Sequence, residues 1–311
     1  MSIAMREAFG AHLVELGLTH PSLVVLDADV SSSTRSKLFE AAFPERFFNV
    51  GVAEGNLADV ANGLATCGFH PVVNSFAVFL ALKSTDQIRN VSCYNHLPVV
   101  FAGAYGGLSD SFDGASHQSV EDIAIFRALP GMQVIVPADA RQAVLALDYA
   151  LTQQGPVYIR LNRNSVPDLP EPEAFETAEA QLLRKGKDVT IATNGITASF
   201  ALEAAELLAR KGIEAEVLSV PFVKPLRFGV LGESIRKTGR LLSVEEHVME
   251  GGFGSALCEQ CMRDGLHPVY DAIALSGFGE TGPYEELLAK YGISAEHIAH
   301  RACALCKEEI A

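Results

Sequence analysis

One carboxylate in this sequence stands where a strand is expected to run into a helix. Glu54 lies in the segment from Phe48 to Ala65, which starts as a short strand-like run and continues as a helix of small residues. Its neighbours in the chain are Gly, Ala and Val, which offer no counter-charge. A half-buried glutamate there can move a proton or hydrogen-bond a ring nitrogen of a bound cofactor. The alternative is a helix-start carboxylate that only accepts hydrogen bonds from free backbone amides.

A second group of polar residues lies in the glycine-rich loop expected at 103 to 118. Asp113, His117 and Gln118 follow an expected strand at 98 to 102, at the edge where open α/β sheets bind ligands. Aspartate and histidine at that edge can hydrogen-bond hydroxyl groups or move protons. The length of the loop also favours a function. The structural alternative is a capping aspartate and a solvated histidine.

Two Cys-x-x-Cys pairs could bind a metal. They are Cys258 with Cys261 and Cys303 with Cys306, out of six cysteines in the chain. Around the first pair, apolar residues recur at i, i+3 and i+4, which is typical of one helix face and unlike a zinc knuckle. We therefore expect reduced thiols that pack against apolar neighbours.

The composition excludes several classes of partner. The chain has 311 residues, of which 49% are hydrophobic, and a formal net charge of -14. This charge argues against nucleic acid or an anionic membrane as the main partner, so any phosphorylated ligand must be held by local arginines. No run of 18 apolar residues and no leader-like start is seen, which predicts a cytoplasmic protein.

The order of predicted elements indicates an α/β protein with two doubly wound, mostly parallel sheets. Strands and helices alternate from the first helix at 4 to 17, with a helix at 32 to 42, to a strand at 157 to 161. A segment rich in Pro, Glu and Ala follows, and a new strand begins at Asp188. We expect a first domain at 1–168, a linker at 169–187 and a second domain at 188–311.

Most nucleotide, metal and hydrolase motifs are missing from the sequence. It contains no G-x-x-x-x-G-K-[ST], H-E-x-x-H or G-x-S-x-G segment. Gly252-Phe-Gly254 is a partial glycine loop that lacks the third glycine of a dinucleotide site, so helix packing explains it better.

Over nearly all of its length the chain resembles the C-terminal half of transketolase, namely its pyrimidine-binding and C-terminal domains. The first domain carries matching segments at Leu26-Asp-Ala-Asp-Val-Ser-Ser-Ser, Gly51-Val-Ala-Glu-Gly-Asn, Asn74-Ser-Phe-Ala-Val-Phe, Asp113-Gly-Ala-Ser-His-Gln, Val134-Ile-Val-Pro-Ala-Asp and Asn162-Arg-Asn-Ser-Val-Pro. The second carries them at Lys224-Pro-Leu, Val244-Glu-Glu-His, Gly251-Gly-Phe-Gly-Ser-Ala and Phe278-Gly-Glu-Thr-Gly-Pro-Tyr.

The resemblance implies a thiamine diphosphate enzyme that transfers a two-carbon ketol unit from a ketose to an aldose. Glu54 matches the glutamate that hydrogen-bonds the aminopyrimidine ring of the cofactor. Phe76 and Phe79 match aromatic positions around that ring, although core packing at i, i+3 is an alternative. Asp29 matches a residue that supports the cofactor site.

Other matching positions imply the substrate contacts. Asp113 and His117 match residues that contact the ketose hydroxyls and the reacting carbon. Arg6, Ser33 and Arg163 match positions that bind the terminal phosphate of sugar phosphates, where a forked donor is suited to an anion.

The sequence departs from the family near the sugar. Tyr105 replaces the usual histidine eight residues before Asp113, Ser111-Phe112 replaces Gly-Glu, and Leu82 replaces a tyrosine found in many relatives. Arg6, Ser33 and Arg163 remain, so an anionic tail such as phosphate or sulfonate is still expected. Ordinary pentose phosphates are less well supported as substrates.

The diphosphate-binding signature of the family, Gly-Asp-Gly followed by a distant Asn, does not occur in this sequence. The resemblance therefore implies a separate N-terminal subunit that holds Mg²⁺ and the diphosphate, in an α2β2 heterotetramer. The alternatives are a deoxyxylulose-phosphate synthase relative, the beta chain of a 2-oxoacid dehydrogenase, or a metal-binding scaffold that uses the Cys-x-x-Cys pairs.

Overall fold

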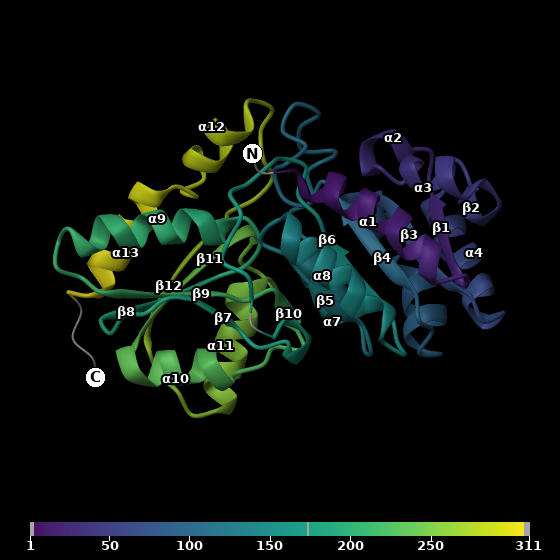
Figure 1. Ribbon diagram of the computed structural model, residues 1–311. Helices are drawn as coiled ribbons and strands as arrows, with labels where there is room; N and C mark the ends of the chain where they lie inside the picture. The colour runs from purple at the N-terminus through teal and green to yellow at the C-terminus, as the bar shows by residue number, and fades with distance from the viewer. Residues whose placement is uncertain (1–2, 173, 308–311) are drawn as a thin grey trace.

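The computed structural model describes residues 3–172 and 174–307, which form two β-sheets that carry helices on both faces (Figure 1). The first sheet has the strand order β10-β5-β6-β4-β3-β1-β2 and the second β12-β11-β8-β9-β7. Neighbouring strands run parallel except that β10 is antiparallel to β5 and β7 is antiparallel to β9. The predicted fold class is confirmed.

The first sheet is covered by helices from the first half of the chain. Its strands are β1 (Leu23–Asp27), β2 (Phe47–Asn49), β3 (His70–Phe76), β4 (Val100–Ala104), β5 (Gln133–Ile135), β6 (Val157–Arg160) and β10 (Phe222–Lys224). The helical segments are α1 (Met5–Thr19), α2 (Ser31–Thr34), α3 (Lys37–Ala42), η1 (Pro44–Arg46), α4 (Glu54–Thr66), α5 (Ala77–Lys83), α6 (Thr85–Gln87), η2 (Ile88–Cys93), α7 (Asp122–Ala128) and α8 (Ala140–Leu151).

The second sheet has helices α9 and α13 on one face and α10 and α11 on the other (Figure 1). Its strands are β7 (Gln181–Arg184), β8 (Val189–Thr193), β9 (Ala215–Ser219), β11 (Arg240–Val248) and β12 (Val269–Leu275). The helical segments are η3 (Phe175–Thr177), α9 (Thr197–Ala209), α10 (Gly229–Thr238), α11 (Phe253–Arg263), α12 (Tyr284–Lys290) and α13 (Ala295–Leu305).

Local sequence explains the main elements. The central strands β1, β4 and β8 are buried at every residue, as expected for strands that are covered on both faces. Helix α8 begins after Asp139, whose side chain accepts a hydrogen bond from the Gln142 amide at 2.7 Å. Helix α10 ends at Gly239, which adopts the left-handed conformation (φ 64°) that favours glycine.

The structure differs from the sequence-based fold in three details. The helix expected at 32–42 is two helices, α2 and α3, because Arg35 between them is left-handed (φ 68°). The expected linker contains strand β7, which forms the edge of the second sheet. Strand β10 returns from the second half of the chain to the edge of the first sheet, a crossing that the alternation of elements did not predict.

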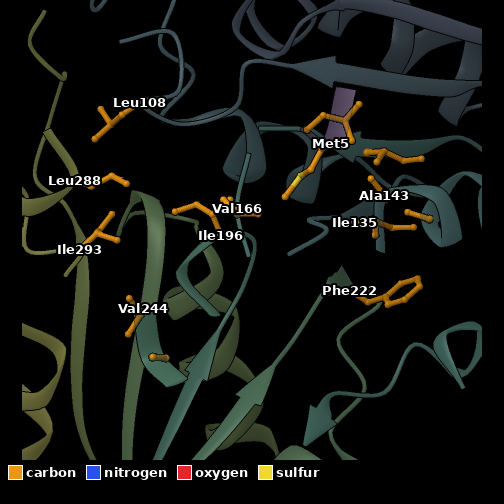
Figure 2. Close-up of a cluster of buried hydrophobic side chains, with 14 of the residues drawn as sticks. Met5, Leu108, Ile135, Ala143, Val166, Ile196, Phe222, Val244, Leu288 and Ile293 are labelled. Atoms are coloured by element: carbon orange, nitrogen blue, oxygen red, sulfur yellow. The ribbon is translucent and has the colours of Figure 1, made fainter. Parts of the chain in front are cut away.

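One of the buried apolar clusters contains side chains from both halves of the chain and forms a shared core between them. Figure 2 shows Met5, Ile135 and Ala143 on the side of the first sheet and Val244 and Ile293 on the side of the second. Val166 and Ile196 lie between them (Figure 2). Because this core is shared, the position of one sheet is fixed relative to the other.

A buried arginine adds polar contacts at the same junction. The Arg160 side chain on β6 is 5% exposed, and its Nε donates to Asp122 Oδ2 at 2.9 Å. Its Nη2 donates to the backbone oxygens of Ser119 at 2.8 Å and Glu246 at 3.0 Å. Burial alone would raise the pKa of Asp122, but Arg160 holds this pKa below its ordinary value. Arg160 therefore links β6, α7 and β11.

Substitution of Arg160 by methionine should lower the free energy of unfolding by roughly 3–5 kcal/mol, because Asp122 would keep a buried charge without its partner. Arg141→Met is the matched control, since Arg141 pairs with Glu171 on the surface at 3.6 Å, and it should cost about 0–1 kcal/mol. Urea unfolding of the two variants checks this. Equal losses would mean that the buried pair adds nothing beyond a surface pair.

Candidate functional site

Glu54 is the first residue of α4, and its side chain is only 4% exposed. No residue adjacent to Glu54 in the chain carries a counter-charge, but the structure brings Lys83 from the end of α5. Lys83 Nζ lies 3.4 Å from Glu54 Oε2 and 3.5 Å from Oε1. The flanking residues alone did not indicate this partner, because Lys83 is 29 residues away along the chain.

Four rings form an aromatic cluster beside this carboxylate, made of Phe76, Phe79, Tyr105 and His117. Phe76 and Phe79 are stacked, with ring centroids 5.6 Å apart and an interplanar angle of 21°. The His117 ring lies edge-on to Phe79 at 5.2 Å, and Tyr105 lies edge-on to Phe76 at 4.4 Å. Lys83 Nζ is 3.9 Å from the Phe79 centroid, which connects the cluster to Glu54.

Two arginines stand over the tyrosine of this cluster. The guanidinium carbon of Arg6 is 5.5 Å from the Tyr105 ring centroid and that of Arg163 is 5.1 Å from it. Arg6 Nη1 donates to the Tyr105 hydroxyl at 2.6 Å and to the Ser33 backbone oxygen at 3.0 Å. Arg6 Nε is buried and has no protein partner among the described residues. The structure thus brings together Arg6, Ser33, Arg163 and Tyr105, and leaves one buried N–H donor for a ligand.

Sequence reasoning missed one acidic residue next to these arginines. Asp110 Oδ1 accepts a hydrogen bond from Arg163 Nη1 at 2.8 Å, and its side chain is 1% exposed. Asp110 Oδ2 is buried without a partner in the described part of the chain. Burial and then the nearby Asp113 raise the pKa of Asp110, while Arg163 and His117 oppose this rise. The sequence offered one sign of this residue, since Asp110 lies three residues before Asp113 in the same loop.

Asp113 and His117 lie on the loop between β4 and α7. Asp113 is exposed, and His117 is partly buried with its Nδ1 3.0 Å from the Ser116 hydroxyl. Gln118 anchors the loop to the second half of the chain, because its Nε2 donates to the Glu280 backbone oxygen at 2.9 Å. Asp113 and His117 therefore keep polar groups that a ligand can reach.

The base of the loop requires glycine. A Cβ on Gly107, which has φ +67°, would lie 2.3 Å from the carboxyl carbon of Glu246. Glu246 accepts hydrogen bonds from the Leu108 amide at 2.8 Å and from the Tyr284 hydroxyl at 2.9 Å. Burial raises the pKa of Glu246 to about 7. These contacts hold the start of the loop against β11.

Asp29, which was expected to support the cofactor site, lies at the protein surface. It is exposed and left-handed (φ 65°), and Asn49 Nδ2 donates to its Oδ1 at 3.3 Å. The buried carboxylate of this segment is Asp27, which sequence reasoning missed. Asp27 accepts hydrogen bonds from the Val30 amide at 2.6 Å and the Ser36 hydroxyl at 2.8 Å. Asp27 therefore fixes the turn that carries Ser33.

The cysteines lie on helices. Cys258 and Cys261 are on α11, and Cys303 lies on α13 with Cys306 just after it. In residues 3–172 and 174–307, no group of three or more His, Cys, Asp or Glu side chains is placed to hold a metal ion. In the same residues, no helix is both long and apolar enough to cross a membrane.

Comparisons with known families cover most of the chain. Residues 1–168 match the family described as "Transketolase, pyrimidine binding domain". Residues 178–298 match the family described as "Transketolase, C-terminal domain".

Two similar proteins are about as long as this chain. A "Putative transketolase C-terminal section" of Methanocaldococcus jannaschii is 39% identical, and the match covers 98% of this chain and 97% of that protein. The "6-deoxy-6-sulfo-D-fructose transketolase subunit SqwH" of Clostridium sp. (strain MSTE9) is 37% identical over 96% of this chain and 93% of that protein. Four 1-deoxy-D-xylulose-5-phosphate synthases are 35 to 38% identical, and there the chain spans about half of the relative, 46 to 48%.

A solved structure described as "Split gene transketolase, inactive beta4 tetramer" is also similar. It is 43% identical to this chain with a TM-score of 0.90, and the match covers 98% of each chain.

The buried Asp27 should make stability depend on pH. Burial raises its pKa to about 6 from 3.8, so its contribution to folding is lost as the pH rises through 6. Between pH 5 and pH 7.5, the wild type should lose roughly 1–2 kcal/mol of unfolding free energy relative to Asp27→Asn. Urea unfolding at both pH values checks this, with exposed Asp59→Asn as the control. A wild-type-to-Asn difference that is independent of pH would contradict it.

Proposed function

We propose that this chain, which belongs to the transketolase family, is the C-terminal subunit of a thiamine diphosphate-dependent transketolase. The reaction transfers a two-carbon ketol unit from a ketose to an aldose. The observation that carries this proposal is the buried Glu54 carboxylate beside the stacked rings of Phe76 and Phe79. The two relatives of similar length that are named as a transketolase section and a transketolase subunit support it.

The residues around Glu54 fit the pyrimidine end of the cofactor. The Glu54 carboxyl group can form a hydrogen bond with a ring nitrogen. Its ion-pair partner in this chain, Lys83, is half exposed. Phe76 and Phe79 offer apolar faces suited to a planar ring. When bound, thiamine diphosphate supplies the carbon that carries the two-carbon unit between the sugars. Asp29 is proposed to support this end of the site from the turn after β1.

The loop residues are proposed to handle the sugar. Asp113 is exposed and can accept hydrogen bonds from ketose hydroxyls. His117 lies against Phe79 at 5.2 Å, so its ring can reach the same space as a group stacked on Phe79. We assign it the movement of a proton at a sugar oxygen, because an imidazole can both donate and accept a proton.

Arg6, Ser33, Arg163 and Tyr105 are proposed to bind an anionic tail of the sugar. Both guanidinium groups lie over the Tyr105 ring, and the buried Nε of Arg6 is a donor that a tail oxygen would satisfy. The relative whose name includes 6-deoxy-6-sulfo-D-fructose supports a sulfonate in this place.

A second polypeptide is proposed to complete the site. Two apolar side chains near this site are largely exposed. Val52, two residues before Glu54, is 72% exposed, and Leu82, which precedes the Lys83 that pairs with Glu54, is 58% exposed. Such surface is suited to contact with another chain. We assign this role to an N-terminal subunit that would hold the diphosphate and Mg²⁺, in an α2β2 heterotetramer. The solved relative named as an inactive β4 tetramer fits the view that this kind of chain lacks activity by itself.

A deoxyxylulose-phosphate synthase activity is the second candidate, because four such synthases match this chain. The two candidate activities differ in chemistry, since a synthase decarboxylates pyruvate and a transketolase does not. Release of CO₂ from pyruvate by the assembled complex would decide for the synthase.

Glu54→Gln in the assembled complex should lower kcat for ketol transfer by roughly 100-fold or more, because the amide cannot exchange a proton with a ring nitrogen. The assay combines this chain with its N-terminal partner, thiamine diphosphate, Mg²⁺, a ketose with an anionic tail and an aldose. Glu206→Gln is the matched control, since Glu206 is an exposed carboxylate paired with Arg184 at 2.8 Å, and it should keep full activity. Full activity of the Glu54→Gln complex, or of this chain alone, would contradict the proposal.

A further inference from the structure

Asp110 occupies a position that an anionic ligand would also seek. It accepts a hydrogen bond from Arg163 at 2.8 Å, and Arg163 lies over the same Tyr105 ring as Arg6. The Asp110 side chain is 1% exposed, so water screens its charge poorly. An anion that approaches the two arginines therefore meets one negative charge that is already in place.

The charges around Tyr105 can be counted from the contacts. Arg6 and Arg163 carry two positive charges, and Asp110 carries one negative charge, which leaves a net charge of +1 within this group. Asp113 is the further acidic group that acts on Asp110, and it is exposed. A tail with one negative charge balances this group, whereas a tail with two leaves an excess negative charge in a partly buried place.

We propose that Asp110 is a specificity-determining residue that makes the arginine pair prefer a monoanionic tail, of the sulfonate class, over a dianionic phosphate. This rests on the proposed function, because it assigns the tail of the same sugar. The unpaired Oδ2 of Asp110 supports it. A carboxylate that served only to orient Arg163 would gain from a second hydrogen bond, and in the described structure this atom has none.

The effect should depend on the charge of the ligand. Coulomb energy is proportional to the product of the two charges, so removal of the Asp110 charge should favour a dianion twice as strongly, in free energy, as a monoanion. If Asp110→Asn tightens the binding of a dianion by about tenfold, it should tighten that of a monoanion by about threefold.

The first experiment measures anion binding by this chain alone, because Arg6, Tyr105, Asp110 and Arg163 all belong to it. Inorganic phosphate at pH 8 is the dianionic probe and methanesulfonate is the monoanionic probe, with isothermal titration calorimetry as the measurement. Asp110→Asn should bind phosphate about tenfold more tightly than wild type and methanesulfonate about threefold more tightly. Asp264→Asn, an exposed Asp on the far helix end of α11, is the matched control and should change neither affinity.

The second experiment uses the assembled complex and two ketoses that differ only at the tail, fructose 6-phosphate and 6-deoxy-6-sulfofructose. Asp110→Asn should lower KM for the phosphate sugar by about tenfold and KM for the sulfonate sugar by about threefold, with little change in kcat. A residue with a purely structural role would raise both KM values together. Asp110→Ala, which also removes the charge, should act in the same direction and covers the case in which the Asn variant does not fold.

The outcomes separate this inference from the proposed function. Phosphate affinity that stays the same or falls in Asp110→Asn overturns the role of Asp110, even if the complex transfers ketol units normally. A complex without ketol transfer overturns the proposed function, while the calorimetric result still decides whether Asp110 sets the charge preference of the arginine pair.

Discussion

The loop between β4 and α7, which carries the candidate sugar-binding residues, depends on the buried guanidinium of Arg160. This group pairs with Asp122 and donates to the backbone of Ser119 and Glu246, so one side chain joins the first sheet, the functional loop and the second sheet. A buried charge must keep all of these partners, because the loss of any one leaves polar groups unsatisfied away from water. The loop between β4 and α7 begins against Arg160, since a Cβ on Gly106 would lie 2.7 Å from its Cγ. The positions of the loop side chains follow from this constraint.

From this base the site extends in two directions over one aromatic cluster. Glu54 and Lys83 lie at one end, next to Phe79, and the two arginines lie at the other end, over Tyr105. The first end is suited to a planar nitrogen ring and the second to an anion, which is the arrangement that a sugar extending from a cofactor would need. In its proposed role Asp110 moderates the charge at the second end, so a change at one loop position would alter the charge of the tail that this fold prefers.

Much of the fold could be predicted from the sequence, whereas the roles of the candidate site residues stay predictions. Buried apolar strands such as β1 and small-residue helices such as α4 are specified by local pattern. Lys83 and Asp110 could not be predicted in the same way, because their roles come from contacts with residues 29 and 53 positions away. The break at Arg35 depends on one left-handed residue within a helical pattern, and the return of β10 to the first sheet depends on packing between the two halves. Periodicity carries none of this information.

In the proposed assembly Glu54 lies in one wall of a cofactor site whose other wall is a different polypeptide. The most direct measurement is calorimetric titration of thiamine diphosphate, with Mg²⁺ present, into this chain, into its N-terminal partner, and into the equimolar mixture. We expect saturable binding at one cofactor per pair of chains in the mixture. In this chain alone the affinity should be weaker by a factor of at least about 100, since the contacts from the partner would be missing. Binding to this chain alone with the affinity of the mixture would contradict it.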